Sequence, residues 1–281
     1  MLPKMRSIQP FSHSKSDDRR QSAVCYTEGE IEMSSGADLT DLSVQPFAER
    51  FRQEMVPLSN AFAYFSTLPL SEEDVRGYLE EPIAALPPTI QVLLGRVSIM
   101  LVPYLEQTPG QGQHRVAFEK PAPGREAWGA HFVSPGQATL VFAIKEQEVA
   151  SHHYTFYRAV ATVTADQMPS EAEGRFFGLL RGELRNNTAG EVDQLGWELK
   201  QTLRRRQSKS VRESKLFREY ARQALIDTLT LYLHGICCDI DVEAGPRQLP
   251  SRYLRKRLEL LYEFFPPPER YAVFPEQVSS G

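Results

Sequence analysis

Two ionisable residues inside a strongly apolar segment are the first candidates for chemistry in this sequence. Residues 225–233 are apolar on nearly every side of a predicted helix, which is typical of a helix buried in a core. Asp227 and His234 are seven residues apart and therefore share one flank of that helix. A buried carboxylate must find a partner. Either the pair lines a cavity as catalytic or metal-binding groups, or an arginine of the last predicted helix binds Asp227 while His234 caps its own helix, and the second interpretation is the simpler.

The residues that follow this helix form an acidic run. On an extended strand Asp239, Asp241 and Glu243 would point to one face, where three carboxylates repel one another unless a cation lies among them. Mg²⁺ and Ca²⁺ prefer such oxygen ligands, and with His234 the set could hold a transition metal. The alternative is that these acids neutralise the basic residues in 247–257.

A third set of candidates stands where a predicted strand leads into a predicted helix at 151–164. His153 lies in the first turn of that helix, and Glu146 and Glu148 come just before it. Imidazoles in this context can bind a metal, with a nearby glutamate as the base that activates water. The zinc-protease pattern His-Glu-x-x-His is absent, however, and adjacent histidines point about 100° apart on a helix. Packing at the surface or in the core is the alternative role for His153.

The three cysteines predict no disulfide framework. Cys25 lies in a polar N-terminal stretch, and Cys237 and Cys238 are adjacent, a spacing at which a disulfide is strained. A reactive thiol at 237 or 238 would need a neighbour such as His234 to lower its pKa, whereas buried cysteines in apolar surroundings are usually inert. Without disulfides, secretion signal or membrane-spanning stretch, the sequence predicts a cytoplasmic protein.

One basic cluster, Arg204, Arg205 and Arg206, could bind phosphate or nucleic acid. Glutamates are interspersed in the surrounding sequence, and the chain has a net charge of −4 with a pI near 5.9. Nucleic acid is therefore not the favoured partner, and a solvated helix end explains the arginines equally well. The sequence has no glycine-rich phosphate loop and no Cys-x-x-Cys zinc spacing.

The elements that must position these candidates indicate an α+β fold. Residues 1–40 are polar and predicted to be disordered, and 41–281 are predicted to form one domain. Within 41–95 the phenylalanines recur at three- and four-residue intervals, which predicts a helical segment interrupted at Pro57. The run Ser71-Glu72-Glu73-Asp74 predicts a further helix start, with a helix that ends at Pro82.

Residues 97–144 predict an antiparallel sheet of about four strands. The runs at 127–133 and 138–144 flank the turn 134–137 and are typical of a hairpin. The connections between strands look too short for crossover helices, hence the antiparallel prediction. Helices predicted within 150–268, above all Ser214–His234, form a layer that packs on this sheet.

No complete catalytic arrangement is visible, so the sequence predicts a soluble, non-enzymatic binding or regulatory module. Its expected partner is another protein, contacted through the N-terminal helical segment and the basic surfaces, with no membrane involved. The alternative is a metal-dependent hydrolase that uses a divalent metal, with Glu146 or Glu148 as the base. Its metal ligands would be His153, Asp227, His234, Asp239 and Asp241.

Overall fold

The computed structural model describes residues 42–59, 61–107, 112–206, 213–238 and 247–274. The predicted N-terminal tail, 1–40, and the predicted metal ligands Asp239 and Asp241 lie outside these residues.

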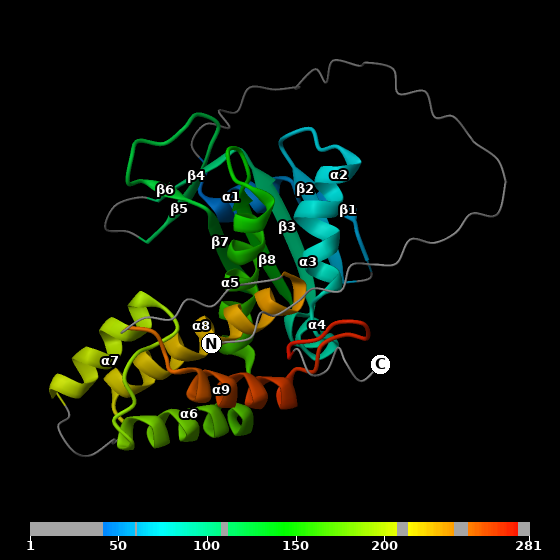
Figure 1. The fold of residues 1–281 in the computed structure, drawn as a ribbon. Coiled ribbons are helices and arrows are strands. Elements are labelled where there is room, and N and C mark those ends of the chain that lie inside the picture. Colours follow the sequence, from blue (N-terminus) through cyan, green and yellow to red (C-terminus); the bar gives the residue numbers. More distant parts are fainter. Residues whose placement is uncertain (1–41, 60, 108–111, 207–212, 239–246, 275–281) are drawn as a thin grey trace, which may run out of the picture.

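The α+β class is confirmed, with two sheets and a large helical layer (Figure 1). The main sheet has the strand order β1-β2-β3-β8-β7, and the smaller sheet has the order β5-β4-β6. The strands of the main sheet are β1 (Val56–Pro57), β2 (Phe62–Ser66), β3 (Arg96–Val102), β7 (Gly129–Ser134) and β8 (Gln137–Ala143). The smaller sheet consists of β4 (Tyr104–Gln107), β5 (His114–Ala117) and β6 (Glu126–Ala127).

The main sheet is mixed, so the prediction of a wholly antiparallel sheet is wrong for its centre. Strands β2, β3 and β8 run parallel to one another, and only the edge pairs β1–β2 and β7–β8 are antiparallel. The predicted hairpin is confirmed: Ser134 pairs with Gln137, and Gly136 adopts the positive φ that the turn requires. Within 97–144 the prediction erred because the chain returns from β3 to β8 through the strands of the smaller sheet and β7, so the parallel pair β3–β8 needs no crossover helix. In addition, β2 had not been recognised as a strand, which hid the helical crossover between β2 and β3.

The phenylalanine pattern within 41–95 is helical only at its start. Helix α1 covers Val44–Arg50 and is followed by the short 3-10 helix η2 (Arg52–Glu54). Phe62 and Phe65 belong instead to strand β2, whose neighbour β3 buries Phe62 almost completely. Intervals of three and four residues between aromatic side chains fit either structure over so short a stretch, and pairing with β3 decides between them.

The crossover from β2 to β3 contains α2 (Glu72–Val75), a π-helical turn η3 (Arg76–Glu80), α3 (Glu81–Ala84) and α4 (Pro88–Leu94). The predicted helix start is confirmed as a capping box, in which Ser71 Oγ accepts from the Asp74 amide and the Asp74 carboxylate accepts from the Ser71 amide. The prediction that this helix ends at Pro82 is wrong. The backbone widens into the π-turn before the proline, and the helical segment continues to Ala84.

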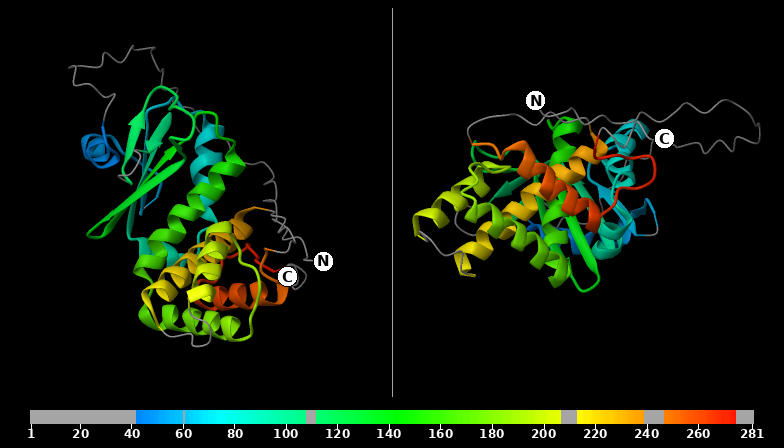
Figure 2. Two further views of the ribbon diagram at one scale, coloured as in Figure 1. Left: turned by 90° about the vertical axis from the view of Figure 1, so that its left-hand side faces the viewer. Right: turned by 60° about the horizontal axis from the view of Figure 1, so that its bottom comes forward.

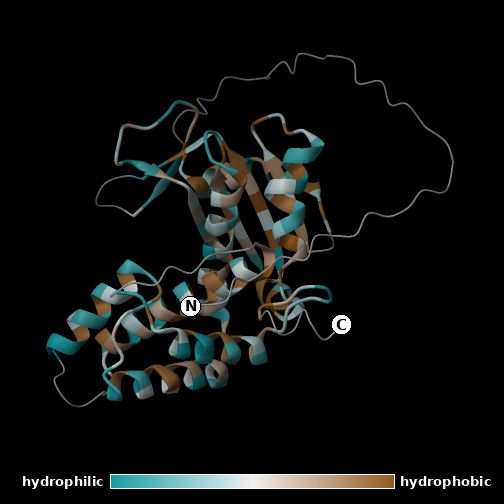
Figure 3. Ribbon diagram, viewed as in Figure 1, coloured by the Kyte–Doolittle hydropathy of each residue, from teal (hydrophilic) through white to brown (hydrophobic). Residues whose placement is uncertain are grey.

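The helical layer is built from α5 (Val149–Gln167), α6 (Ser170–Arg185), α7 (Gln194–Arg206), α8 (Lys215–Cys237) and α9 (Ser251–Phe264). Helix α5 runs along the main sheet and continues into the layer, where it packs against α8 (Figure 2). Side chains of β3 alternate between the two faces: Ile99 and Leu101 join the core shared with α5 and α8, whereas Met100 and Val102 face the smaller core under α1. Apolar residues accordingly gather on the central strands (Figure 3).

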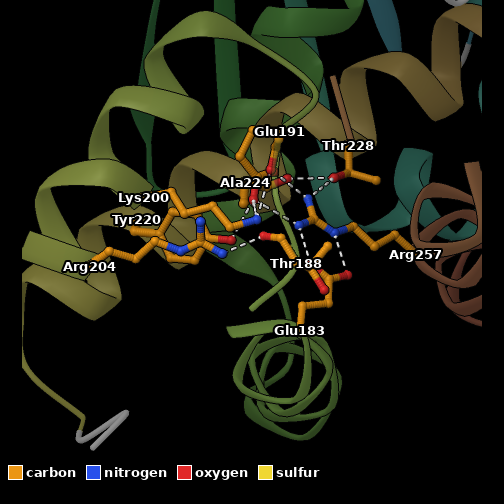
Figure 4. A network of polar contacts seen from close by, with 10 residues as sticks. Glu183, Thr188, Glu191, Lys200, Arg204, Tyr220, Ala224, Thr228 and Arg257 are labelled. Carbon is orange, nitrogen blue, oxygen red and sulfur yellow. Dashed lines mark hydrogen bonds and ion pairs between the residues drawn. The ribbon is translucent and has the colours of Figure 1, made fainter. Parts of the chain in front are cut away.

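A fully paired ionic network holds the helical layer together (Figure 4). The Arg257 guanidinium, which is completely buried, donates to the carboxylates of Glu183 and Glu191. Lys200 Nζ lies 2.9 Å from Glu191 Oε1, and the Tyr220 hydroxyl donates to the same oxygen. Burial alone would raise the pKa of Glu191, but Arg257 and Lys200 outweigh it and lower the pKa to about 2. Two cations and two carboxylates thus neutralise one another in the core, which indicates a structural role.

Candidate metal centre

One imidazole and two thiols converge where α5 meets the end of α8. Among the residues that the structure describes, the His, Cys, Asp and Glu side chains close enough to hold a metal ion together are His153, Cys237 and Cys238. Their donor atoms all lie within 4.8 Å of one another. His153 Nδ1 is 3.2 Å from Cys238 Sγ and 3.8 Å from Cys237 Sγ. His153 is buried and the two cysteines are half-buried, so the cluster lies just below the surface.

The orientation of His153 originates in the π-turn. Pro82 has no amide hydrogen, so it offers no partner to the carbonyl of Tyr78, four residues earlier, or to that of Gly77, five residues earlier. The first turn of α5 supplies the donors instead: His152 Nε2 lies 2.9 Å from the Tyr78 carbonyl oxygen, and His153 Nε2 lies 2.7 Å from that of Gly77. Two adjacent histidines thereby fasten α5 to two adjacent backbone carbonyls.

The hydrogen bond to Gly77 fixes which nitrogen of His153 faces the thiols. A carbonyl oxygen only accepts, so Nε2 carries a hydrogen and donates it to Gly77, and Nδ1 is the nitrogen that lies toward the two sulfur atoms. Imidazoles that bind metals through one ring nitrogen characteristically donate the N–H of the other nitrogen to a backbone carbonyl, carboxylate or water. His152 differs: burial lowers its pKa to about 4, and its ring packs edge-on between Tyr78 and Phe142, so it remains a neutral structural residue.

A change of backbone conformation brings both cysteines to the same histidine. Cys237 is the last residue of α8, and Cys238 is extended, with φ −123° and ψ 147°. Adjacent residues within a helix would point about 100° apart. Because the helix ends between them, both sulfur atoms can approach His153, while the Cys238 amide still donates to the His234 carbonyl at 2.8 Å.

Within the cluster the protons are shared unequally. The hydrogen bond from the Cys238 thiol lowers the pKa of Cys237 against the effect of burial, and His153 lowers it further. The same bond, together with burial, raises the pKa of Cys238. Burial opposes a charge on His153, but its hydrogen bonds outweigh burial and raise its pKa. The pKa directions favour a thiolate at Cys237, whereas the sulfur closer to His153 is Cys238 Sγ. Because the two thiols share a proton, we assign one negative charge to the pair rather than to either cysteine.

These distances match a zinc coordination shell. In a tetrahedral site with Zn–N near 2.0 Å and Zn–S near 2.3 Å, nitrogen and sulfur ligands are about 3.6 Å apart. The two observed N···S distances, 3.2 and 3.8 Å, lie on either side of that value. Thiolate and imidazole ligands favour zinc over Mg²⁺ or Ca²⁺, which take oxygen ligands. Three protein ligands leave one coordination position for water or a further ligand.

Of the predicted site residues, Asp227 lies outside this cluster. Asp227 Oδ1 is 3.3 Å from Arg158 Nη1 and 2.7 Å from Gln223 Nε2. A guanidinium therefore binds Asp227, as the simpler interpretation expected, but it comes from α5 and not from the last helix. Oδ2 is buried with no hydrogen-bond partner among the described residues. Burial and the neighbouring Asp193 raise the pKa of Asp227 to about 6.

The structure places His234, Glu146 and Glu148 together, but along an open cleft of about 700 Å³ rather than at the thiols. The His234 ring lies 6.0 Å from that of Tyr154 and 6.0 Å from that of Tyr157, and burial lowers its pKa. Glu146 Oε2 is 2.6 Å from Lys120 Nζ, and that hydrogen bond lowers the pKa of Glu146. A base needs the opposite adjustment, so Glu146 is a poor candidate for that role.

The basic triplet ends α7, where cations suit the helix dipole. Arg204 Nη2 donates to the Thr188 carbonyl at 2.6 Å, which gives it a structural contact, while Arg205 and Arg206 are exposed. Neither phosphate nor nucleic-acid binding by Arg204, Arg205 and Arg206 is tested by this arrangement, and both stay predictions.

Sequence reasoning considered the cysteines as a nucleophile beside His234 and did not join them to His153. The two are separated by more than eighty residues, and only the packing of α5 on α8 brings them together. The sequence did contain a usable signal: two adjacent histidines lie near the start of one helix, and two adjacent cysteines lie at the end of another.

The chain matches no known family model, no curated protein and no solved structure. In the described part of the chain, no helix is both long enough and apolar enough to cross a membrane.

Proposed function

We propose that this protein is a zinc-dependent binding or regulatory module in which His153, Cys237 and Cys238 hold the ion. The observation that carries the proposal is the orientation of the His153 ring: Nδ1 faces both sulfur atoms, while Nε2 donates its hydrogen to the Gly77 carbonyl. A metal there would fasten the end of α8 to α5 and, through Gly77, to the crossover that joins β2 and β3. Zinc occupancy would then set how firmly these elements hold together, and in this sense we propose a regulatory role.

The proposal includes a reducing compartment such as the cytoplasm. Cys237 and Cys238 are free thiols, and thiol ligands persist where disulfides do not form. A protein partner, rather than a nucleic acid, remains the expected target of the module, in keeping with the negative net charge.

Metal content tests this proposal directly. We expect about one zinc per chain, by mass spectrometry of metals, in protein purified after zinc supplementation without chelators. Cobalt in place of zinc should give an intense near-ultraviolet sulfur-to-metal absorption and visible bands typical of tetrahedral coordination. Zinc at a hundred times its dissociation constant should stabilise the fold by about 2.7 kcal/mol.

Matched variants separate specific from adventitious binding. Cys237→Ser, Cys238→Ser and His153→Ala should each lose the metal and the cobalt–sulfur band, because each removes one of three ligands. Cys25→Ser removes the remaining cysteine of the chain and should keep both. Equal metal content in the three ligand variants and in Cys25→Ser would refute the zinc site.

The second candidate is a metal-dependent hydrolase, favoured by the coordination position that three protein ligands would leave open. The cleft that Glu148 and His234 share is not lined by these ligands, so water at the metal would itself have to supply the nucleophile. This candidate requires zinc-loaded protein to hydrolyse activated esters or phosphodiesters faster than His153→Ala protein does. Equal rates would leave the binding module as the function of the zinc site.

A further inference from the structure

A second site is marked by the cleft between the β8–α5 turn, the start of β7 and the end of α8. Two aromatic side chains stand exposed at its wall, Trp128 with 45% and Tyr154 with 41% of their surface accessible. Large aromatic groups so exposed beside a concave surface are typical of ligand sites. The cleft volume of about 700 Å³ suits a small molecule or one side chain of a peptide.

The charged side chains that line the cleft are acidic. Its lining includes the carboxylates of Glu146 and Glu148 and contains no lysine or arginine. Glu146 already forms an ion pair with Lys120, and both side chains are at least half exposed. Glu148, by contrast, forms no ion pair within the described part of the chain. The first turn of α5 also faces this region, and the dipole at a helix N-terminus favours anions. The effect is limited to that turn, and the Glu148 carboxylate at the N-cap offsets it.

One buried acceptor in the cleft wall lacks a donor. Gln147 is only 9% exposed, and its Nε2 donates to Thr155 Oγ1 at 3.1 Å, so its amide group lies against another lining residue. Its Oε1 has no hydrogen-bond partner among the described residues. A buried amide oxygen without a donor is costly, and Oε1 is shielded from solvent, so a ligand N–H group would reach it only after the Gln147 side chain turned toward the cleft.

We propose that this cleft binds a small organic cation with N–H donors, an amine or a guanidinium. The cationic group would donate to Glu148 and lie over the faces of Trp128 and Tyr154, since aromatic rings attract cations through their negative faces. His234 closes the wall on the α8 side, and burial lowers its pKa, so it adds no competing charge. This site does not depend on a metal at His153.

Fluorescence of Trp128 gives the test. The chain has two tryptophans, so Trp197→Phe protein reports on Trp128 alone. We expect saturable changes with agmatine, a free guanidinium compound, or with the blocked peptide acetyl-Gly-Arg-Gly-amide, and the comparison of these two identifies the source of the cation. The citrulline peptide, a neutral isostere of the arginine peptide, should not bind.

Two charge-removing variants complete the test. Glu148→Gln should weaken binding of the tighter probe about tenfold, because a charge-assisted hydrogen bond is lost. Glu171→Gln is the matched control: Glu171 is also an exposed acid at a helix start, in α6, but lies outside the cleft, so affinity should not change. The proposal is overturned if neither cation binds, if the citrulline peptide binds equally well, or if both variants behave alike.

Discussion

Replacing Asp227 by asparagine should make the protein more stable at neutral pH. The Asp227 side chain is 1% exposed, and of its two oxygens only Oδ1 has partners, Arg158 and Gln223. Burial is the largest influence on this carboxyl, and its pKa rises from the ordinary 3.8 to about 6. That difference corresponds to about 3 kcal/mol of destabilisation whenever the carboxyl is ionised. Asparagine has nearly the same shape and carries no charge to bury.

The sign of the pH dependence follows from the direction of this pKa change. A carboxyl whose pKa is raised on folding favours the folded state below pH 3.8, and this contribution is lost as the pH rises through about 6. The variant has no such group. Asp227→Asn and the parent should therefore be equally stable near pH 4, and the variant should be up to about 3 kcal/mol more stable near pH 7.5.

Urea denaturation of metal-free protein across that pH range measures the difference. Asp193→Asn serves as the control, because Asp193 contacts the same Arg158 but its side chain is 33% exposed, so removing its charge should change stability by less than about 1 kcal/mol. An Asp227→Asn protein that is less stable than the parent at neutral pH would refute the reasoning, since it would mean that Arg158 more than compensates for burial.

Two further predictions concern the helical layer. Gly196→Ala should destabilise the protein although alanine favours helices, because a Cβ at 196 would lie 2.9 Å from Asp227 Oδ2. Gly182→Ala is the control: a Cβ at 182 meets nothing within 4 Å, so this variant should be more stable than the parent by up to about 1 kcal/mol. Thermal unfolding that ranks the two variants the other way would contradict this prediction. Glu191→Gln should cost about 3 to 5 kcal/mol by leaving Arg257 and Lys200 underpaired in the core, whereas Glu263→Gln, which breaks an exposed pair with Arg175, should cost less than about 1 kcal/mol in the same urea titration. Similar losses for the two glutamate variants would show that the buried network contributes no more than a surface pair.

Local signals predicted the elements that carry their own caps and turns. Helix α8 was expected at Ser214–His234 and covers Lys215–Cys237, since Ser214 Oγ accepts from the Phe217 amide and the apolar pattern is long. The hairpin β7–β8 was likewise specified by its turn. Strand β2 was missed because five residues are too few to separate helical from strand spacing, and its identity depends on pairing with β3, which lies 30 residues further along.

The candidate site was only partly predictable, because its contacts are decided by packing between elements. That a buried Asp227 needs a cation follows from electrostatics alone, but the source of the cation does not. Arg257, the buried arginine of the last helix, is already bound by Glu183 and Glu191. Arg158 of α5 takes its place because α5 is the helix that packs most extensively on α8.

The candidate metal centre depends on a hydrogen bond that proline, at residue 82, cannot make. Had residue 82 an amide hydrogen, it could donate to the Tyr78 carbonyl with α-helical spacing or to the Gly77 carbonyl with π-helical spacing, and one of the two would need no side-chain donor. With proline there, His152 and His153 supply a donor to each of the two adjacent carbonyls. The ring of His153 then has one orientation, with Nδ1 toward the end of α8, before any ion arrives. A ligand held so firmly loses little conformational freedom on binding zinc, and the two thiols need only complete what the π-turn has already fixed.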